Sequence, residues 1–143
     1  MSVYLDSSCL LKLLFPEPES AAVAALVAAE PRVVVSTLAR LEARVRIAAR
    51  VTGGSLKRPL ALRLVRQMDA TLASAPFEVV SLPAGVAELA EQQVLFARTA
   101  VHCRSLDRLH LATMQALALD RILTSDVAQG NAARSLGFIV LHP

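Results

Sequence analysis

Five short β-favouring apolar runs alternate with longer stretches of helical character along the chain. We predict strands at residues 3–5, 32–36, 77–82, 121–125 and 138–141. The helices predicted between them cover residues 7–15, 17–30, 37–51, 59–73, 83–99, 106–119 and 128–136. Strands separated by helices pair in parallel, and the helices cover both faces of the sheet. The sequence therefore predicts an α/β fold, a three-layer α/β/α sandwich with a five-stranded parallel sheet, formed by one domain over residues 1–143.

The composition agrees with helices packed closely on a sheet, because alanine is abundant and aromatic residues make up only 3% of the chain. The longest uninterrupted apolar run, Ala21 to Ala29, is far shorter than the roughly 20 residues that span a bilayer. Cys9 and Cys103 stand far apart, without a CxxC motif. We expect a cytoplasmic protein that has no membrane contact, no disulfide and no zinc site.

Positive charge is concentrated between residues 40 and 66. This segment holds one acid, Glu42, and eight basic residues, whereas the whole chain has a net charge of only +3. The basic residues are Arg40, Arg44, Arg46, Arg50, Lys57, Arg58, Arg63 and Arg66. Such a bias is compatible with a solvated helical surface and with a surface that faces phosphates.

Two acids follow predicted strands directly. Asp6 comes after the strand at residues 3–5, and Asp126 follows the strand at residues 121–125. Because the carboxyl ends of parallel strands share one edge of the sheet, both carboxylates are expected at that edge, where ligands bind in open α/β sheets. The alternative for each is a helix cap.

Two further acids, Glu42 and Asp107, lie on predicted helices. The predicted helix 37–51 has an apolar stripe of Leu38, Leu41, Val45 and Ala48, which places Glu42 on the flank that faces the sheet. A buried carboxylate needs a partner; on an exposed face, an ion pair with Arg46 would suffice. Asp107 opens the predicted helix 106–119, and the topology alone leaves its edge of the sheet undecided.

A shared site is the alternative to four unrelated acids. Carboxylates gathered in one pocket repel one another unless a cation lies between them. Hard oxygen ligands of this kind suit Mg²⁺ or Mn²⁺, and those ions suit phosphates. An acidic pocket beside an arginine-rich surface is typical of a metal-dependent nuclease.

The chain resembles the PIN-domain family, and specifically its VapC-type toxin ribonucleases. The matching motifs span the chain in the order of the family. They are Leu5–Lys12, Glu17–Ser20, Ser36–Glu42, Leu106–Thr113, Leu123–Asp126 and Leu136–Pro143.

This resemblance implies a catalytic site of Asp6, Glu42, Asp107 and Asp126 around Mg²⁺, with Mn²⁺ as a substitute; the expected metal ligands are Asp6, Asp107 and Asp126. It also implies that Ser7 and Thr124 support the carboxylates or a water on the metal. The expected activity is endonucleolytic cleavage of tRNA, rRNA or mRNA. Expected partners are a small cognate antitoxin and a second copy of the chain, through helices 37–51 and 59–73. The arginines expected to bind RNA or a partner are Arg40, Arg44, Arg46 and Arg50.

Two residues near these acids, His110 and Lys12, are left outside the predicted site. His110 is interpreted as a buried histidine with hydrogen-bonded nitrogens that packs its helix on the sheet. Lys12 either reaches a phosphate or covers apolar surface with its stem. Some PIN domains carry a further acid after the position of Asp126, but residues 127–131 contain none and Asn131 offers only an uncharged oxygen. One metal ion is therefore expected instead of two.

Two other functions are compatible with the sequence. A PIN-like module that binds RNA or protein without cleaving it is the main alternative, and the presence of all four acids argues against it. An aspartyl-phosphate enzyme with Asp6 as the nucleophile is weaker, because such an enzyme needs a second acid nearby and the chain has Leu5 and Ser8 there.

Overall fold

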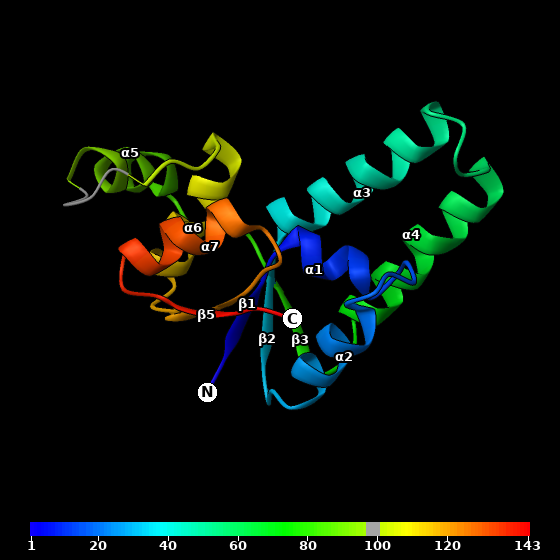
Figure 1. Cartoon of the computed structure of the whole chain (residues 1–143), viewed down its shortest axis with the longest axis horizontal. Coiled ribbons are helices and arrows are strands. Elements are labelled where there is room, and N and C mark those ends of the chain that lie inside the picture. Colours follow the sequence, from blue (N-terminus) through cyan, green and yellow to red (C-terminus); the bar gives the residue numbers. More distant parts are fainter. Residues whose placement is uncertain (97–100) are drawn as a thin grey trace.

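The computed structural model describes residues 1–96 and 101–143, and its centre is a sheet of five parallel strands (Figure 1). The strands are β1 (Val3–Leu5), β2 (Val33–Ser36), β3 (Phe77–Val80), β4 (Arg121–Leu123) and β5 (Ile139–Leu141). Their order in the sheet is β3-β2-β1-β4-β5. Because the chain runs outward from β1 in both directions, the crevice between β1 and β4 is the switch point at which open α/β sheets bind ligands.

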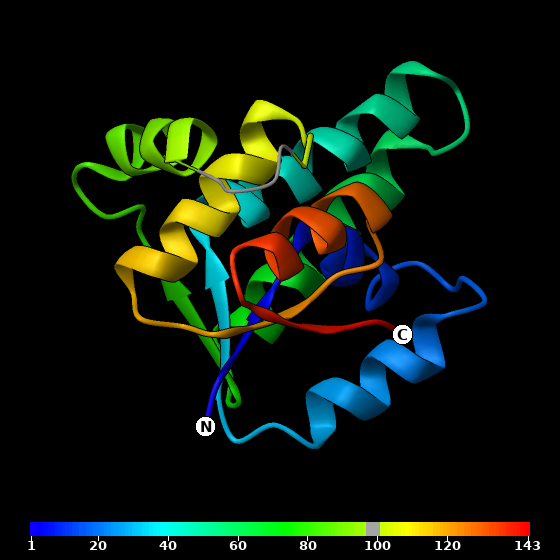
Figure 2. The ribbon, with the colours of Figure 1, turned by 60° about the vertical axis from the view of Figure 1, so that its left-hand side comes forward.

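Seven helices in the described ranges cover the two faces of this sheet. Helices α1 (Ser7–Lys12), α2 (Ser20–Ala28), α3 (Thr37–Thr52) and α4 (Arg58–Leu72) lie on one side, and α5 (Val86–Phe96), α6 (Ser105–Ala116) and α7 (Val127–Ser135) lie on the other (Figures 1 and 2). The predicted three-layer α/β/α arrangement with a five-stranded parallel sheet is confirmed. The α3–α4 pair extends well beyond the sheet (Figure 1).

The core follows from the alternation of side chains along the short strands. Val3 and Leu5 point toward the face covered by α1 to α4, whereas Tyr4 points toward α6 and α7. All three side chains are fully buried. A strand buried on both faces reads as a continuous apolar run, and this is why these strands were recognisable in the sequence.

Several helices are shorter than predicted. The helix predicted at 7–15 ends at Lys12, and the one predicted at 17–30 covers Ser20–Ala28. The helix predicted at 83–99 is α5, which begins after Gly85, because that glycine has a positive φ of 77° that a right-handed helix does not accept. The predicted positions 97–99 lie outside the described residues.

The predicted inward position of the apolar stripe on the third helix is wrong. Leu38 is buried as expected, but Leu41 and Val45 are each 57% exposed. The inward face of α3 is instead formed mainly by Ala39, Ala43 and Ile47. Small alanine side chains let α3 approach the neighbouring elements closely, so the face with the larger apolar residues is the one that remains outside.

Among the described residues, no helix combines the length and the apolar character that crossing a bilayer requires.

Candidate active site

Two of the four predicted acids lie at the carboxyl ends of neighbouring strands. Asp6 follows β1 and caps α1, and Asp126 follows β4 and caps α7 with its side chain accepting from Gln129 N. The Asp6 backbone N–H donates to the Leu123 carbonyl at 3.1 Å, which ties the two strand ends together. Both residues therefore cap helices, as the alternative predicted. They nevertheless lie at the same edge of the sheet.

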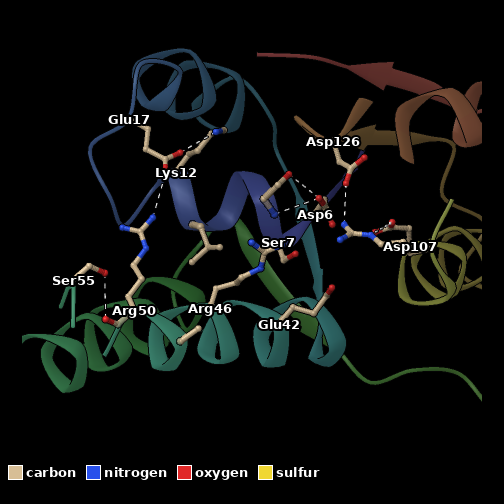
Figure 3. Close-up of a pocket in the computed structure, with 14 residues that line it drawn as sticks. Asp6, Ser7, Lys12, Glu17, Glu42, Arg46, Arg50, Ser55, Asp107 and Asp126 are labelled. Carbon is tan, nitrogen blue, oxygen red and sulfur yellow. Dashed lines mark hydrogen bonds and ion pairs between the residues drawn. The ribbon is translucent and has the colours of Figure 1, made fainter. Parts of the chain in front are cut away.

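The other two acids reach the same place from helices. Glu42 lies in the second turn of α3, and Asp107 lies in the first turn of α6. All four predicted acids line one cavity of about 440 Å³ (Figure 3). Its other lining residues are Ser7, Ser8, Leu11, Lys12, Glu17, Arg46, Ala49, Arg50, Ser55 and Arg104. The structure thus brings together all four carboxylates.

Asp6 is held by hydroxyl groups. Its Oδ2 accepts from Ser8 Oγ at 2.7 Å and from Thr124 Oγ1 at 3.1 Å. Thr124 Oγ1 also accepts from Asp126 N at 3.0 Å and lies 2.9 Å from Gln129 Oε1, so the buried hydroxyl joins β4, α7 and Asp6. The sequence prediction named Thr124 and Ser7; Ser7 lines the cavity, but the serine hydroxyl bonded to Asp6 belongs to Ser8.

Asp107 and Asp126 share a cation that the sequence analysis did not identify. Arg104 donates from Nε to Asp107 Oδ2 and from Nη2 to Asp126 Oδ2, each at 3.2 Å. The Arg104 side chain is 68% exposed, whereas that of Asp107 is only 7% exposed. Burial raises the pKa of the Asp107 carboxyl, Arg104 opposes that rise, and the nearby charges of Asp126 and Asp6 add to it.

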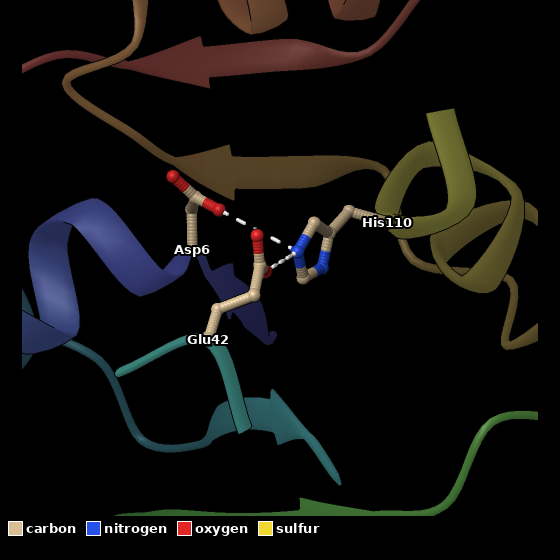
Figure 4. Close-up of side chains that lie close together, drawn as sticks. All are labelled: Asp6, Glu42 and His110. Carbon is tan, nitrogen blue, oxygen red and sulfur yellow. Dashed lines mark hydrogen bonds and ion pairs between the residues drawn. The ribbon is translucent and has the colours of Figure 1, made fainter. Parts of the chain in front are cut away.

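His110 is buried and hydrogen-bonded, as predicted, and it also belongs to the acidic cluster. Its Nε2 contacts Glu42 Oε1 and lies 3.8 Å from Asp6 Oδ1 (Figure 4). Its Nδ1 lies 2.6 Å from the Tyr4 hydroxyl. The partner of the inward Glu42 carboxylate is therefore this imidazole, and no sequence signal beyond the helical spacing of three from Asp107 indicated the contact.

The four candidate arginines separate into two groups. Arg46 and Arg50 line the cavity, and the Arg50 guanidinium also stacks 3.9 Å from the centre of the Phe15 ring. Arg44 forms an ion pair with Asp69 of α4 at 2.7 Å, and Arg40 does not line the cavity. Only two of the four arginines thus stand beside the carboxylates.

Lys12 enters the same cavity but is already paired. Its Nζ lies 2.9 Å from Glu17 Oε2 and 2.7 Å from Glu19 Oε2. These two ion pairs raise the pKa of the Lys12 ammonium, mainly through the contact with Glu19. Lys12 therefore balances the charges of Glu17 and Glu19. It is not paired with the acids at the strand ends in this structure.

The donor set fits a hard divalent cation. Carboxylate oxygens dominate the acidic end of the cavity, and one ligand atom each from Asp6, Glu42 and His110 lies within 4.8 Å of the others. Asn131 is exposed, and its amide oxygen accepts from Arg134 at 3.2 Å. The group with the spacing of metal ligands is thus Asp6, Glu42 and His110, while Asp107 and Asp126 line the same cavity. No further acid follows Asp126 within residues 127–131.

Comparison with known proteins agrees with this architecture. Residues 3–135 match the PIN domain. Ribonuclease VapC46 of Mycobacterium tuberculosis is 32% identical, and the match covers 99% of this chain and 98% of that protein. The crystal structure of VapC20 from the same organism, described as a toxin that cleaves the sarcin–ricin loop, has a TM-score of 0.74 at 17% identity and 99% coverage of both chains.

A second solved structure places the fold in a complex. VapBC2 from Rickettsia felis, bound to a DNA fragment from its promoter, has a TM-score of 0.72 at 12% identity, and the match covers 100% of this chain and 99% of that one. At such low identity the likeness shows the fold alone. Together with the family match and the full-length relative, however, it leads to one conclusion: this chain belongs to the PIN-domain family and is of the VapC type.

Proposed function

We propose that this protein is an Mg²⁺-dependent endoribonuclease, with Mn²⁺ as a substitute, and that it acts as the toxin of a type II toxin–antitoxin pair. The observation that carries the proposal is the convergence of Asp6, Glu42, Asp107 and Asp126 on one cavity. The full-length relative of 32% identity, which is named a ribonuclease, supports the same activity.

Each acid has a role that follows from its surroundings. Asp6 and Asp107, the two most buried of the four, are the proposed direct ligands. Asp126 and Glu42 would complete the shell or orient the attacking water. When bound, the ion would stabilise the negative charge that develops on the phosphate during cleavage. Ser8 and Thr124 hold the Asp6 carboxylate in place through the hydrogen bonds at its Oδ2.

The substrate is proposed to be RNA, whether tRNA, rRNA or mRNA. Arg46 and Arg50 line the same cavity as the acids and can bind the phosphates that flank the cleaved bond. Arg50 also faces Glu17 at 3.5 Å, so a phosphate competes with a weak existing ion pair.

Two protein partners are proposed. The first is a small antitoxin, because the structural neighbours include the VapBC2 and FitAB assemblies. The second is another copy of this chain. The resemblance implies a contact through α3 and α4, whereas the exposed apolar surface favours a contact through α3 and α6. A groove of about 460 Å³ between α3 and α6 is lined by Leu38, Leu41, Val45 and Leu106, of which the last three are about half exposed. A dimer through this face would cover apolar surface and would place two acidic sites near each other.

Two more general expectations complete the proposal. We propose that residues 1–143 form one domain, since the family match spans residues 3–135 and the last strand, β5, pairs with β4. We also propose that the protein acts in the cytoplasm, where its RNA substrates are found.

The experiment that tests the activity is the Asp6→Asn substitution. This change removes a charge but keeps the shape of the side chain. We therefore expect the rate of RNA cleavage to fall by at least about 100-fold and growth arrest to be lost, while the fold is retained. The assay follows a labelled RNA with Mg²⁺, and the same reaction with EDTA shows the metal requirement.

A matched control is Asp120→Asn, an exposed acid that precedes β4, at the end of this strand opposite to Asp126. It should leave cleavage unchanged. Full activity of the Asp6→Asn protein would remove the proposal. Binding of RNA without cleavage and without any Mn²⁺ affinity in the native protein would point to a PIN-like binding module instead.

A further inference from the structure

A line of buried polar groups leads from the sheet to Glu42. Tyr4 lies on β1, Ser36 ends β2, and His110 lies on α6; all three are fully buried. The Tyr4 hydroxyl lies 2.7 Å from Ser36 Oγ and 2.6 Å from His110 Nδ1. The opposite ring nitrogen, Nε2, contacts Glu42 Oε1. Three elements thus converge on the carboxylate of a fourth.

The hydrogen positions along this line follow from what each group can donate. An ionised carboxylate only accepts, so His110 Nε2 carries the proton that it shares with Glu42. In the neutral ring Nδ1 then accepts from the Tyr4 hydroxyl. Ser36 Oγ, 2.7 Å from the Tyr4 hydroxyl, also accepts from Ala39 N at 3.1 Å. Each buried polar side chain in the line therefore has a partner within hydrogen-bonding distance, as buried networks require.

Glu42 needs such support. Its side chain is 20% exposed and comes from the flank of α3, so it has rotamers that turn toward solvent. Arg46, four residues further along the same helix, lines the same cavity and offers an alternative ion pair. Asp6 Oδ1, close to the same imidazole, repels the Glu42 carboxylate when both are ionised.

We propose that His110 is a positioning residue that holds the Glu42 carboxylate inside the acidic cavity, with Tyr4 and Ser36 fixing the orientation of the imidazole. This inference rests on the proposed ribonuclease function and extends it to a residue that is not one of the four acids. His110 acts through Glu42: it donates one hydrogen bond and prevents the side chain from turning toward Arg46 or solvent.

A metal-ligand role for the imidazole is the competing explanation, since Nε2 stands within 4.8 Å of the candidate ligand atoms of Asp6 and Glu42. The same nitrogen, however, cannot donate a hydrogen to Glu42 and give its lone pair to an ion. The direct contact between Nε2 and Oε1 favours the donor role. The two roles predict different behaviour for a glutamine at position 110, whose amide N–H donates but coordinates poorly.

The test is a double-mutant cycle with His110→Leu and Glu42→Ala, with His110→Gln as the conservative variant. If His110 acts through Glu42, His110→Leu lowers kcat for RNA cleavage by about 10-fold or more in the native background and by less than about twofold beside Glu42→Ala. His110→Gln, which keeps a donor, should restore most of that loss. KM for RNA should change little.

Mn²⁺ affinity, measured by titration calorimetry, supplies a readout that does not depend on turnover. The proposal expects His110→Gln to bind Mn²⁺ within about twofold of the native protein. A loss of about 10-fold or more in both His110 variants would make the imidazole a ligand and overturn the proposal. Equal losses of kcat in the native and Glu42→Ala backgrounds would also overturn it, because they indicate a general effect on the fold.

Two further observations keep the outcomes distinct. Circular dichroism and the unfolding midpoint establish whether each variant folds. If His110→Leu does not fold, Tyr4→Phe takes its place in the cycle: a loss of about twofold or more that disappears beside Glu42→Ala supports the proposal, and no such loss contradicts it. Cleavage by the Asp6→Asn protein would reject the ribonuclease function itself, whereas an inactive Asp6→Asn protein with an additive cycle rejects only the role of His110.

Discussion

Asp6 and Asp107 line one cavity, but the groups that hold them differ in kind. Asp6 and Glu42 are fixed by Ser8, Thr124 and His110, which are side chains of the packed interior or its border. We call this part the hydrogen-bonded half. Asp107 and Asp126 share Arg104, whose side chain is 68% exposed. These three residues are the arginine-bound half.

This difference determines which contacts of the acids form on folding and which a bound cation can replace. Hydrogen bonds between buried groups persist as long as the core around them is packed, because breaking them leaves polar atoms without a partner. Ion pairs with an exposed arginine are screened by salt and exchange readily. The hydrogen-bonded half is thus organised in advance, whereas the arginine-bound half can yield to a cation of higher charge.

The largest expected effect concerns the two cysteines, which report on the two halves. Cys9 follows Asp6 on α1 and is fully buried, and burial raises the pKa of its thiol to about 11. Cys103 precedes Arg104 and is partly exposed. We expect iodoacetamide to modify Cys103 at least about 100 times faster than Cys9, because Cys9 reacts only after local opening of the core.

Mass spectrometry of the labelled peptides measures both rates in one sample. Denaturation in urea should bring the two rates close together, which serves as the control for intrinsic reactivity. Similar rates in the folded protein would break the comparison, since they would mean that the core beside Asp6 opens as easily as the segment that carries Arg104.

The next effect tests the hydrogen-bonded half through Thr124→Val. Valine keeps the shape of threonine but removes the hydroxyl that contacts Asp6, Gln129 and the Asp126 backbone N–H. Because these groups would lose a buried partner, we expect the free energy of unfolding to fall by about 1–3 kcal/mol. Urea unfolding in EDTA measures the change without any contribution from bound metal.

Thr52→Val is the matched control for this experiment. The Thr52 hydroxyl donates to the Ala48 carbonyl at 3.3 Å on an exposed part of α3, so its removal should change the free energy of unfolding by less than about 0.5 kcal/mol. Equal changes in the free energy of unfolding of the two variants would show that the hydroxyl of Thr124 stabilises the protein no more than an exposed hydroxyl does.

The two halves were also unequally accessible to sequence analysis. Asp6 and Asp126 follow strands, and parallel pairing alone brings such positions to one edge, so their convergence was predictable. Ser8, Arg104 and His110 have no comparable signal, because each meets the acids through its side-chain conformation or through the packing of distant elements. Asp107 is intermediate. The sequence predicted that it lies at the start of a helix, but it did not predict at which edge of the sheet this helix starts.

The error on α3 has a related cause. A periodic pattern identifies an apolar face but does not say what covers it. Leu41 and Val45 line the groove next to Leu106, while Ala39 and Ala43 form the packed face. The apolar stripe is therefore present, but it lies on the surface that we propose as a dimer interface. The core contact is made by alanines, which are less hydrophobic than the leucine and valine of the stripe.

The smallest expected effect addresses the arginine-bound half. Arg104 places a positive charge between Asp107 and Asp126, where a divalent cation would compete with it. Arg104→Gln removes that competitor and keeps a polar side chain of similar reach. We therefore expect Mn²⁺ affinity to rise about fivefold in low salt, and this gain to shrink at 0.5 M salt because the charge effect is screened.

Titration calorimetry at two salt concentrations measures this gain, and Arg134→Gln provides the same change in net charge at a distance. The Arg134 guanidinium donates to the uncharged amide of Asn131 and is exposed on α7, so its loss should leave Mn²⁺ affinity unchanged. Weaker Mn²⁺ binding by Arg104→Gln would reverse the interpretation: the arginine would then be holding Asp107 and Asp126 together for the ion. In that case both halves of the site would be organised before the metal binds. They would then differ only in how exposed their supporting side chains are.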